Sequence, residues 1–195
     1  MFTGAELSVR DVIQLNTAGI GLRIPLSNHF VTKAEFEKTR PLLERHHKDL
    51  NSVIVTNDDL AKWIRRDYPK YNIDASVIKN IKKHKTIEKA MELYDSVVLP
   101  MKLNEDLDFL EKIKNKDKIT LFANAGCALT CPSKLCYISI SKINKQHGEE
   151  EFQCSQEIKD RDLLGMVDFP LEPYIEMGFH KFKLLRARRG GMTGF

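Results

Sequence analysis

The sequence lacks a long hydrophobic run. Apolar stretches such as Ser96–Met101 are far shorter than the roughly 20 residues that span a bilayer. The first ten residues also lack a basic leader followed by an apolar segment, which is the pattern of a secretory signal. The sequence therefore predicts a cytoplasmic protein with no transmembrane helix and no membrane partner.

The sequence also lacks a large charge excess of one sign. Thirty-one Lys and Arg oppose 27 Asp and Glu, a formal net charge of +4 that permits an anionic partner without requiring one. Glycine and proline occur at ordinary frequency, with 10 and 7 residues, and no repeat or low-complexity tract is visible, which excludes disordered, collagen-like and solenoid classes. The chain has 195 residues, 42% of them hydrophobic, and is predicted to form a single domain over residues 1–195.

The sequence has four cysteines, too few for a dense disulfide scaffold. In a compartment that keeps thiols reduced, so few cysteines are not a disulfide framework. They are expected to be free thiols or metal ligands, which makes their positions informative.

From Gly19 onward, short β-branched runs alternate with amphipathic stretches, the pattern of a parallel sheet covered by helices. The expected strands are Ile20–Leu26, Ser52–Thr56, Tyr71–Ile78, Val97–Leu99, Ile119–Ala123 and Phe182–Leu185. Between them, helices are expected to begin after the capping residues Thr32, Asn57 and Asn104. A closed barrel of eight units usually takes about 250 residues. The sequence thus predicts an α/β fold with a parallel (β/α) repeat, a partial or incomplete TIM barrel of about six units.

Three cysteines follow the fifth expected strand within ten residues: Cys127, Cys131 and Cys136, in a C-x3-C-P-x3-C-Y pattern, with Cys154 further along the chain. A loop after a strand lies at the carboxyl end of the sheet, where ligands bind in such folds. Four thiolates complete either a tetrahedral zinc site or a [4Fe–4S] cluster. The spacing does not decide between the two metals, although the isolated Cys154 favours a cluster. The alternative is that some are buried core thiols.

Other polar residues end or follow expected strands. Four of them could lie at the same carboxyl end of the sheet and contact substrate: Asn28, Asn57, Ser76 and Asn124. For each of them, a helix cap or a loop hydrogen bond is the alternative role.

The last expected strand and the tail after it are basic. Lys183 and Arg186 are further candidates for substrate contact, and Arg186, Arg188 and Arg189 could bind phosphate or an RNA backbone. No aromatic-rich RNA-binding motif accompanies them.

Two elements of the chain resemble the U32 family, which is called a peptidase family for historical reasons. Asn124–Pro132 is similar to the N-x-x-C-x3-C-P element of U32-like proteins, and Tyr174–Lys183 is similar to the Y-x-x-x-G element near the end of the U32 domain. Cys136-Tyr137 stands where related sequences usually carry a histidine. The resemblance covers most of the chain and implies a partial or complete TIM barrel.

The resemblance also implies a function, since characterised U32 relatives take part in oxygen-independent hydroxylation and several hold a [4Fe–4S] cluster with four cysteines. It implies a small-molecule or RNA-base substrate, the cluster ligands Cys127, Cys131, Cys136 and Cys154, and pairing as a homo-oligomer or with a second U32-like subunit. The alternatives are a non-enzymatic module that binds zinc or nucleic acid, and a U32-type peptidase. Neither a G-x-S-x-G nor an H-E-x-x-H motif is present.

Overall fold

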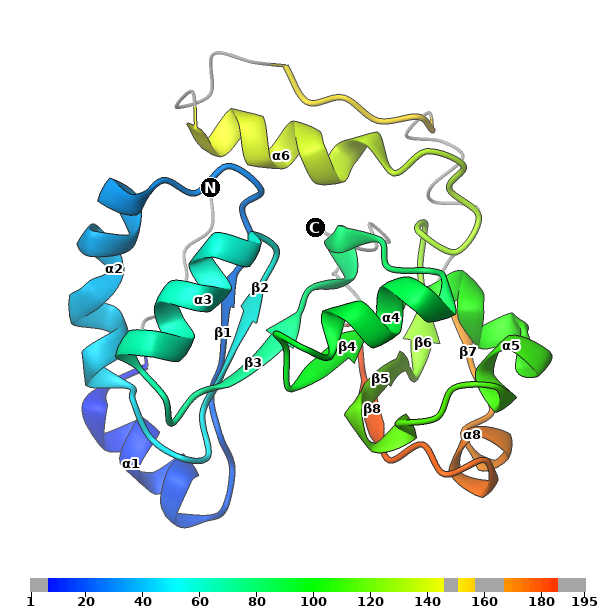
Figure 1. Ribbon diagram of the computed structural model, residues 1–195, viewed down its shortest axis with the longest axis horizontal. Coiled ribbons are helices and arrows are strands. Elements are labelled where there is room, and N and C mark those ends of the chain that lie inside the picture. Colours follow the sequence, from blue (N-terminus) through cyan, green and yellow to red (C-terminus); the bar gives the residue numbers. More distant parts are fainter. Residues whose placement is uncertain (1–6, 146–150, 157–166, 186–195) are drawn as a thin grey trace.

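The fold is a curled half-barrel of six parallel strands with helices on its outer face (Figure 1). It is seen in a computed structural model that describes residues 7–145, 151–156 and 167–185. The strand order is β1-β2-β3-β4-β5-β8, and the partial barrel of about six units expected from the sequence is confirmed. The strands are β1 (Arg23–Leu26), β2 (Ser52–Val55), β3 (Asn72–Ala75), β4 (Ser96–Val98), β5 (Ile119–Phe122) and β8 (Lys181–Lys183).

The helices alternate with these strands along the chain. They are α1 (Val9–Thr17), α2 (Lys33–Arg45), α3 (Asp58–Asp67), α4 (His84–Ala90), α5 (Leu107–Glu111), α6 (Leu135–Lys145) and α8 (Glu172–Glu176). Short 3-10 turns follow or precede strands at η1 (Val77–Lys79), η2 (Met101–Glu105) and η3 (Lys116–Lys118). Among the helices that the structure describes, none is long and apolar enough to cross a bilayer.

Side-chain caps begin the helices at two of the three expected positions. Thr32 and Glu35 form a reciprocal capping box at α2, and the Asn57 Oδ1 accepts a 3.0 Å hydrogen bond from the backbone N–H of Leu60 at α3. The expectation for Asn104 is wrong. Asp106 caps α5, while Asn104 is buried in η2 and donates from Nδ2 to the Phe122 carbonyl at 2.8 Å.

The two faces of the sheet have different compositions. Val53 and Ile73, which are register neighbours, belong to the outer face, whose fully buried side chains pack against the helices in the main core. Because side chains alternate along a strand, the neighbouring residues Ile54 and Asp74 point to the concave face. That face would form the interior of a closed barrel, and here it carries polar and charged groups next to apolar ones.

A second, short ladder follows β5. β6 (Asn124–Ala125) pairs antiparallel with β7 (Val167–Asp168). The chain then passes through α8 to β8, which pairs parallel with β5. Two-residue strands have too few alternating positions to be recognised in a sequence, and this ladder was not expected from it.

Gly21 lies where the chain enters β1, and it is expected to tolerate no side chain. A Cβ at this position would lie 1.8 Å from the carbonyl oxygen of Leu50, so Gly21→Ala forces two backbone segments apart. We expect a loss of about 3 kcal/mol or more in the free energy of unfolding, measured by urea denaturation. The matched control is Gly19→Ala, where the added Cβ meets nothing within 4 Å and only the left-handed backbone is strained, at about 1–2 kcal/mol. Equal losses in the two variants would contradict this packing.

Candidate functional site

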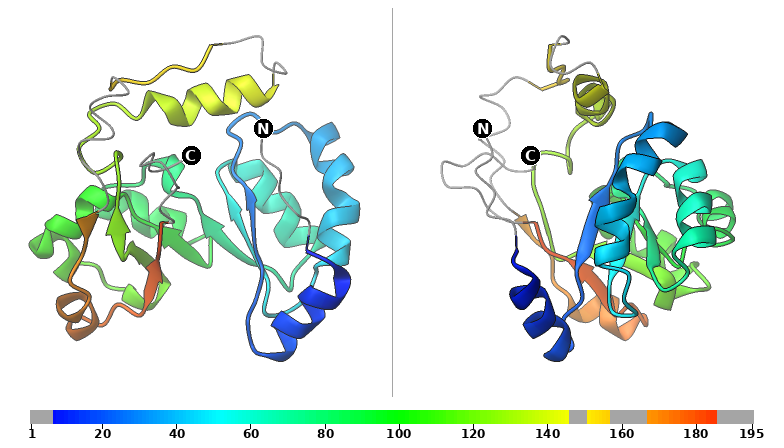
Figure 2. Two further views of the ribbon diagram at one scale, coloured as in Figure 1. Left: turned by 180° about the vertical axis from the view of Figure 1, so that it is seen from behind. Right: turned by 90° about the vertical axis from the view of Figure 1, so that its left-hand side faces the viewer.

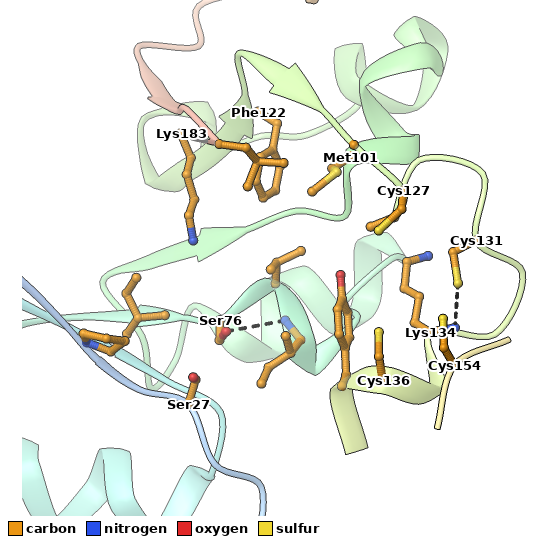
Figure 3. Close-up of a pocket in the computed structure, with 18 of the residues that line it drawn as sticks. Ser27, Ser76, Met101, Phe122, Cys127, Cys131, Lys134, Cys136, Cys154 and Lys183 are labelled. Atoms are coloured by element: carbon orange, nitrogen blue, oxygen red, sulfur yellow. Dashed lines mark hydrogen bonds between the residues drawn. The ribbon is translucent and has the colours of Figure 1, made fainter. Parts of the chain in front are cut away.

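A cavity of about 160 Å³ lies at the carboxyl ends of the strands (Figure 3). Strands from across the sheet supply one side of it, and the cysteine-containing segments supply the other. The lining residues are Pro25, Ser27 and Ile54 from the first two strands and the residue after β1, Ser76, Val77, Ile78 and Met101 after β3 and β4, Phe122, Lys183 and Leu185 from β5 and β8 and beyond, and Gly126, Cys127, Ala128, Cys131, Lys134, Cys136, Tyr137, Cys154 and Gln156 from the segments around α6.

All four cysteines line this cavity, although they come from separate segments. Cys127 and Cys131 lie in the loop between β6 and α6, Cys136 lies in the first turn of α6, and Cys154 lies in the segment 151–156. Within the described part of the chain, no disulfide joins them. Figure 3 shows their sulfur atoms gathered at one end of the cavity.

The thiols influence one another electrostatically. Burial raises the pKa of Cys136 to about 11, and the neighbouring Cys154, Cys131 and Cys127 add to that effect because a second negative charge nearby is unfavourable. Burial also disfavours the Cys131 thiolate. Hydrogen bonds from Ser155 and from the backbone N–H groups of Lys134 and Ser133 outweigh burial, so the pKa of Cys131 is lowered. Cys136 therefore lies within electrostatic range of the other three thiols.

The described cysteine side chains do not gather around a single metal position. Within residues 7–145, 151–156 and 167–185, no three His, Cys, Asp or Glu side chains form a group that could hold a metal ion. A tetrahedral zinc ion needs each sulfur at about 2.3 Å from one centre. A [4Fe–4S] cluster distributes four thiolates over four iron atoms, so its ligands surround a volume. The donor chemistry of four thiols around one cavity suits either group, a four-cysteine zinc site or a [4Fe–4S] cluster.

Helix α6 crosses above the carboxyl ends of the strands (Figures 1 and 2). Asn28, in the loop after β1, donates from Nδ2 to the Ser141 carbonyl at 2.9 Å, and His29 Nδ1 lies 2.9 Å from the Ser141 hydroxyl. Lys145 pairs with Glu35 of α2. These contacts hold α6 so that Cys136 and Tyr137 face the cavity. Asn28 therefore lies outside the lining and anchors the helix.

The Lys145 contact is expected to control the titration of Glu35. The hydrogen bond from Lys145, together with those from Thr32, lowers the pKa of Glu35 to about 2. Because this pKa lies below its unfolded value, the stabilisation is complete above about pH 4.5 and is lost as the pH falls toward 2. We expect Lys145→Met to raise the pKa of Glu35, as measured by carboxyl ¹³C NMR.

The control for this experiment is Lys62→Met, because Lys62 pairs with Asp59 on α3 and has no contact with Glu35. An unchanged Glu35 titration in Lys145→Met would show that α6 is not held by this pair.

Two further asparagines singled out in the sequence also have structural contacts. Asn57 caps α3 and donates to the His29 carbonyl at 3.1 Å. Asn124 makes two hydrogen bonds with the backbone of Leu185, at 3.1 and 2.7 Å, and so fixes the chain after β8. Both lie outside the cavity lining.

Ser76 and Lys183 do line the cavity. Ser76 is buried directly after β3, and its hydroxyl accepts from the backbone N–H of Ile78 at 3.4 Å. Arg186, with Arg188 and Arg189, lies outside the described residues.

Sequence reasoning missed a charged group on the concave face. Arg23 of β1 pairs with Asp74 of β3 at 2.7 Å, and the Ser96 hydroxyl donates to the other carboxylate oxygen. Asp74 is only 5% exposed. The signal was present in the sequence, because Asp74 is a carboxylate between the apolar residues Ile73 and Ala75 of an expected strand, and a buried charge requires a partner.

The architecture is thus an open, six-stranded α/β half-barrel with a thiol-lined cavity at the carboxyl ends of its strands. It is similar to the solved structure of the U32 peptidase Mk0906, with a TM-score of 0.62 and 12% sequence identity, over 92% of this chain and 75% of that chain. No protein-family model matches the sequence, and no curated protein matches it. The likeness establishes a U32-like fold.

Proposed function

We propose that this chain is a U32-like iron–sulfur protein that catalyses oxygen-independent hydroxylation, or a related modification, of a small molecule or an RNA base. The observation that supports it is the meeting of four thiols from separate segments at one cavity. Cys127, Cys131, Cys136 and Cys154 would hold a [4Fe–4S] cluster. The cavity lies at the end of the sheet where barrel enzymes bind their substrates.

The side chains of the cavity suggest how a substrate is positioned. Ile54, Val77 and Phe122 provide apolar walls, while Ser76 and Lys183 provide polar atoms. A bound cluster supplies one-electron transfer. Insertion of an oxygen atom from water into a C–H bond releases two electrons and two protons, so the reaction requires an external electron acceptor such as a redox protein.

The sheet offers a place for a partner. β1 and β8 are its two edge strands, and unpaired edge strands can pair with another chain. The partner would be a second copy of this chain or a second U32-like subunit.

The second candidate is a peptidase, because the similar solved structure is titled a U32 peptidase. Of the described residues that line the cavity, none is His, Asp or Glu, so a Ser-His-Asp triad has no members there beyond Ser27 and Ser76. A peptidase acting at this cavity would have to use a serine or a cysteine as nucleophile, with a lysine as the base. Turnover of a peptide library by protein without iron would favour this candidate.

The test of the proposed function compares cells that lack the gene with cells complemented by the wild-type chain or by Cys127→Ser/Cys131→Ser, all grown without oxygen. We expect a metabolite or an RNA nucleoside heavier by one oxygen atom only with the wild type, as detected by mass spectrometry. Equal product in cells with the double variant would contradict the proposal. A zinc- or nucleic-acid-binding module would leave all three profiles alike.

A further inference from the structure

Lys183 and the thiols occupy opposite ends of the cavity (Figure 3). Lys183 is the register partner of Phe122 on β5, and its Nζ lies 5.8 Å from the centre of the Phe122 ring. The side chain extends from the sheet toward the space in which Ser76 and Ser27 lie. A molecule bound at the Lys183 amine would thus extend toward the cysteines.

The Lys183 amine has no counter-charge of its own. Within the described residues it makes no hydrogen bond and no ion pair. The charge of Asp74 reaches it, but Asp74 is already paired with Arg23 and hydrogen-bonded to Ser96. Burial and the charge of Arg23 lower the pKa of Lys183, and Asp74 opposes them. Asp74 therefore serves Arg23 directly and Lys183 only at longer range, which leaves the Lys183 ammonium without a carboxylate of its own among the described residues.

An uncompensated ammonium beside apolar walls is costly, and a bound anion removes that cost. Ile54, Val77, Met101 and Phe122 line the same cavity, so an apolar ligand body packs against them. A second lysine of the lining, Lys134, lies at the cysteine end. The cavity of about 160 Å³ accommodates a compact, ring-sized body. We propose that Lys183 binds the carboxylate of a small, otherwise apolar substrate and directs the rest of that molecule toward the cysteine end of the cavity.

This inference rests on the proposed function for the identity of the reacting end, and it selects a small molecule over an RNA base as substrate. An RNA nucleobase carries no carboxylate, so an RNA substrate would have to place a backbone phosphate at Lys183, and the RNA arm of the experiment below tests that case.

The experiment measures binding of benzoate and of its neutral analogue benzamide by calorimetry, with anaerobically purified protein. The variants are Lys183→Met and the matched control Lys181→Met, which removes an exposed lysine of the same strand outside this cavity. We expect benzoate to bind the wild type and Lys181→Met alike, and to bind Lys183→Met about tenfold more weakly or worse. Benzamide should bind all three proteins weakly.

Three results would overturn the inference. The first is equal benzoate affinity in Lys183→Met and wild type. The second is no preference for benzoate over benzamide in the wild type. The third is Lys183-dependent binding of a single-stranded RNA by protein that shows no preference for benzoate. Thermal melting of each variant checks the fold, and Lys183→Gln, which keeps a polar side chain without the charge, repeats the test if Lys183→Met does not fold.

Iron and sulfide are measured in the same samples, which separates this inference from the proposed function. Lys183-dependent benzoate binding in protein that never carries iron would support the inference about Lys183 and contradict the proposed iron–sulfur cluster. A cluster in protein that shows no preference for benzoate would support the proposed function and overturn the inference about Lys183.

Discussion

Asp74→Ala is expected to lower the free energy of unfolding by about 1–3 kcal/mol, because the buried Ser96 hydroxyl loses its acceptor and the partly exposed Arg23 loses its counter-charge. Asp74 is the acceptor for Arg23 and Ser96 on the concave face, and its charge also reaches Lys183. Without it, Arg23 and Lys183 lose the carboxylate whose charge reaches both of them. Urea denaturation with matched m-values measures the loss.

The control is Asp59→Ala, since Asp59 forms an exposed pair with Lys62 at 3.0 Å. Exposed pairs contribute at most about 1 kcal/mol, so this variant should remain close to the wild type. Equal effects of the two substitutions would show that the concave face is as well hydrated as the outer surface. The charge imbalance around Lys183 would then lose its significance.

Cys127→Ser/Cys131→Ser is expected to abolish iron and acid-labile sulfide in protein purified without oxygen, because two ligands of four are lost. The control is Ser155→Ala, which removes the hydrogen bond to Cys131 at 3.2 Å and leaves all four thiols in place. This variant should keep its iron, with a changed reduction potential, since hydrogen bonds to cluster sulfurs tune that potential. Wild-type iron content in the double variant would assign the iron to another site.

The fold was largely predictable because buried parallel strands are short, continuous β-branched runs. Ser52–Val55 is such a strand, and Asn57 caps the helix after it as expected. The expectation at Asn104 failed because a 3-10 turn intervenes after β4, so that the helix begins later and Asp106 caps it. The Asn104 amide is instead needed by the Phe122 carbonyl, a contact between distant segments.

The candidate site was less predictable, because tertiary contacts assemble it. The spacing placed Cys127, Cys131 and Cys136 in one loop, but the position of Cys154 depends on the segment 151–156 lying along α6, where the Gln153 N–H donates to the Ser139 hydroxyl at 2.8 Å. The pair of Arg23 and Asp74 depends on the register of β1, β2 and β3. No local pattern contains either relation.

The most direct measurement is the content of iron, acid-labile sulfide and zinc per chain after anaerobic purification, with a visible absorption spectrum of the same sample. The account predicts iron and sulfide in equal amounts, close to one [4Fe–4S] cluster per chain, with the broad visible absorption of thiolate-ligated iron and no zinc. One zinc per chain, or no metal in protein never exposed to oxygen, would contradict it.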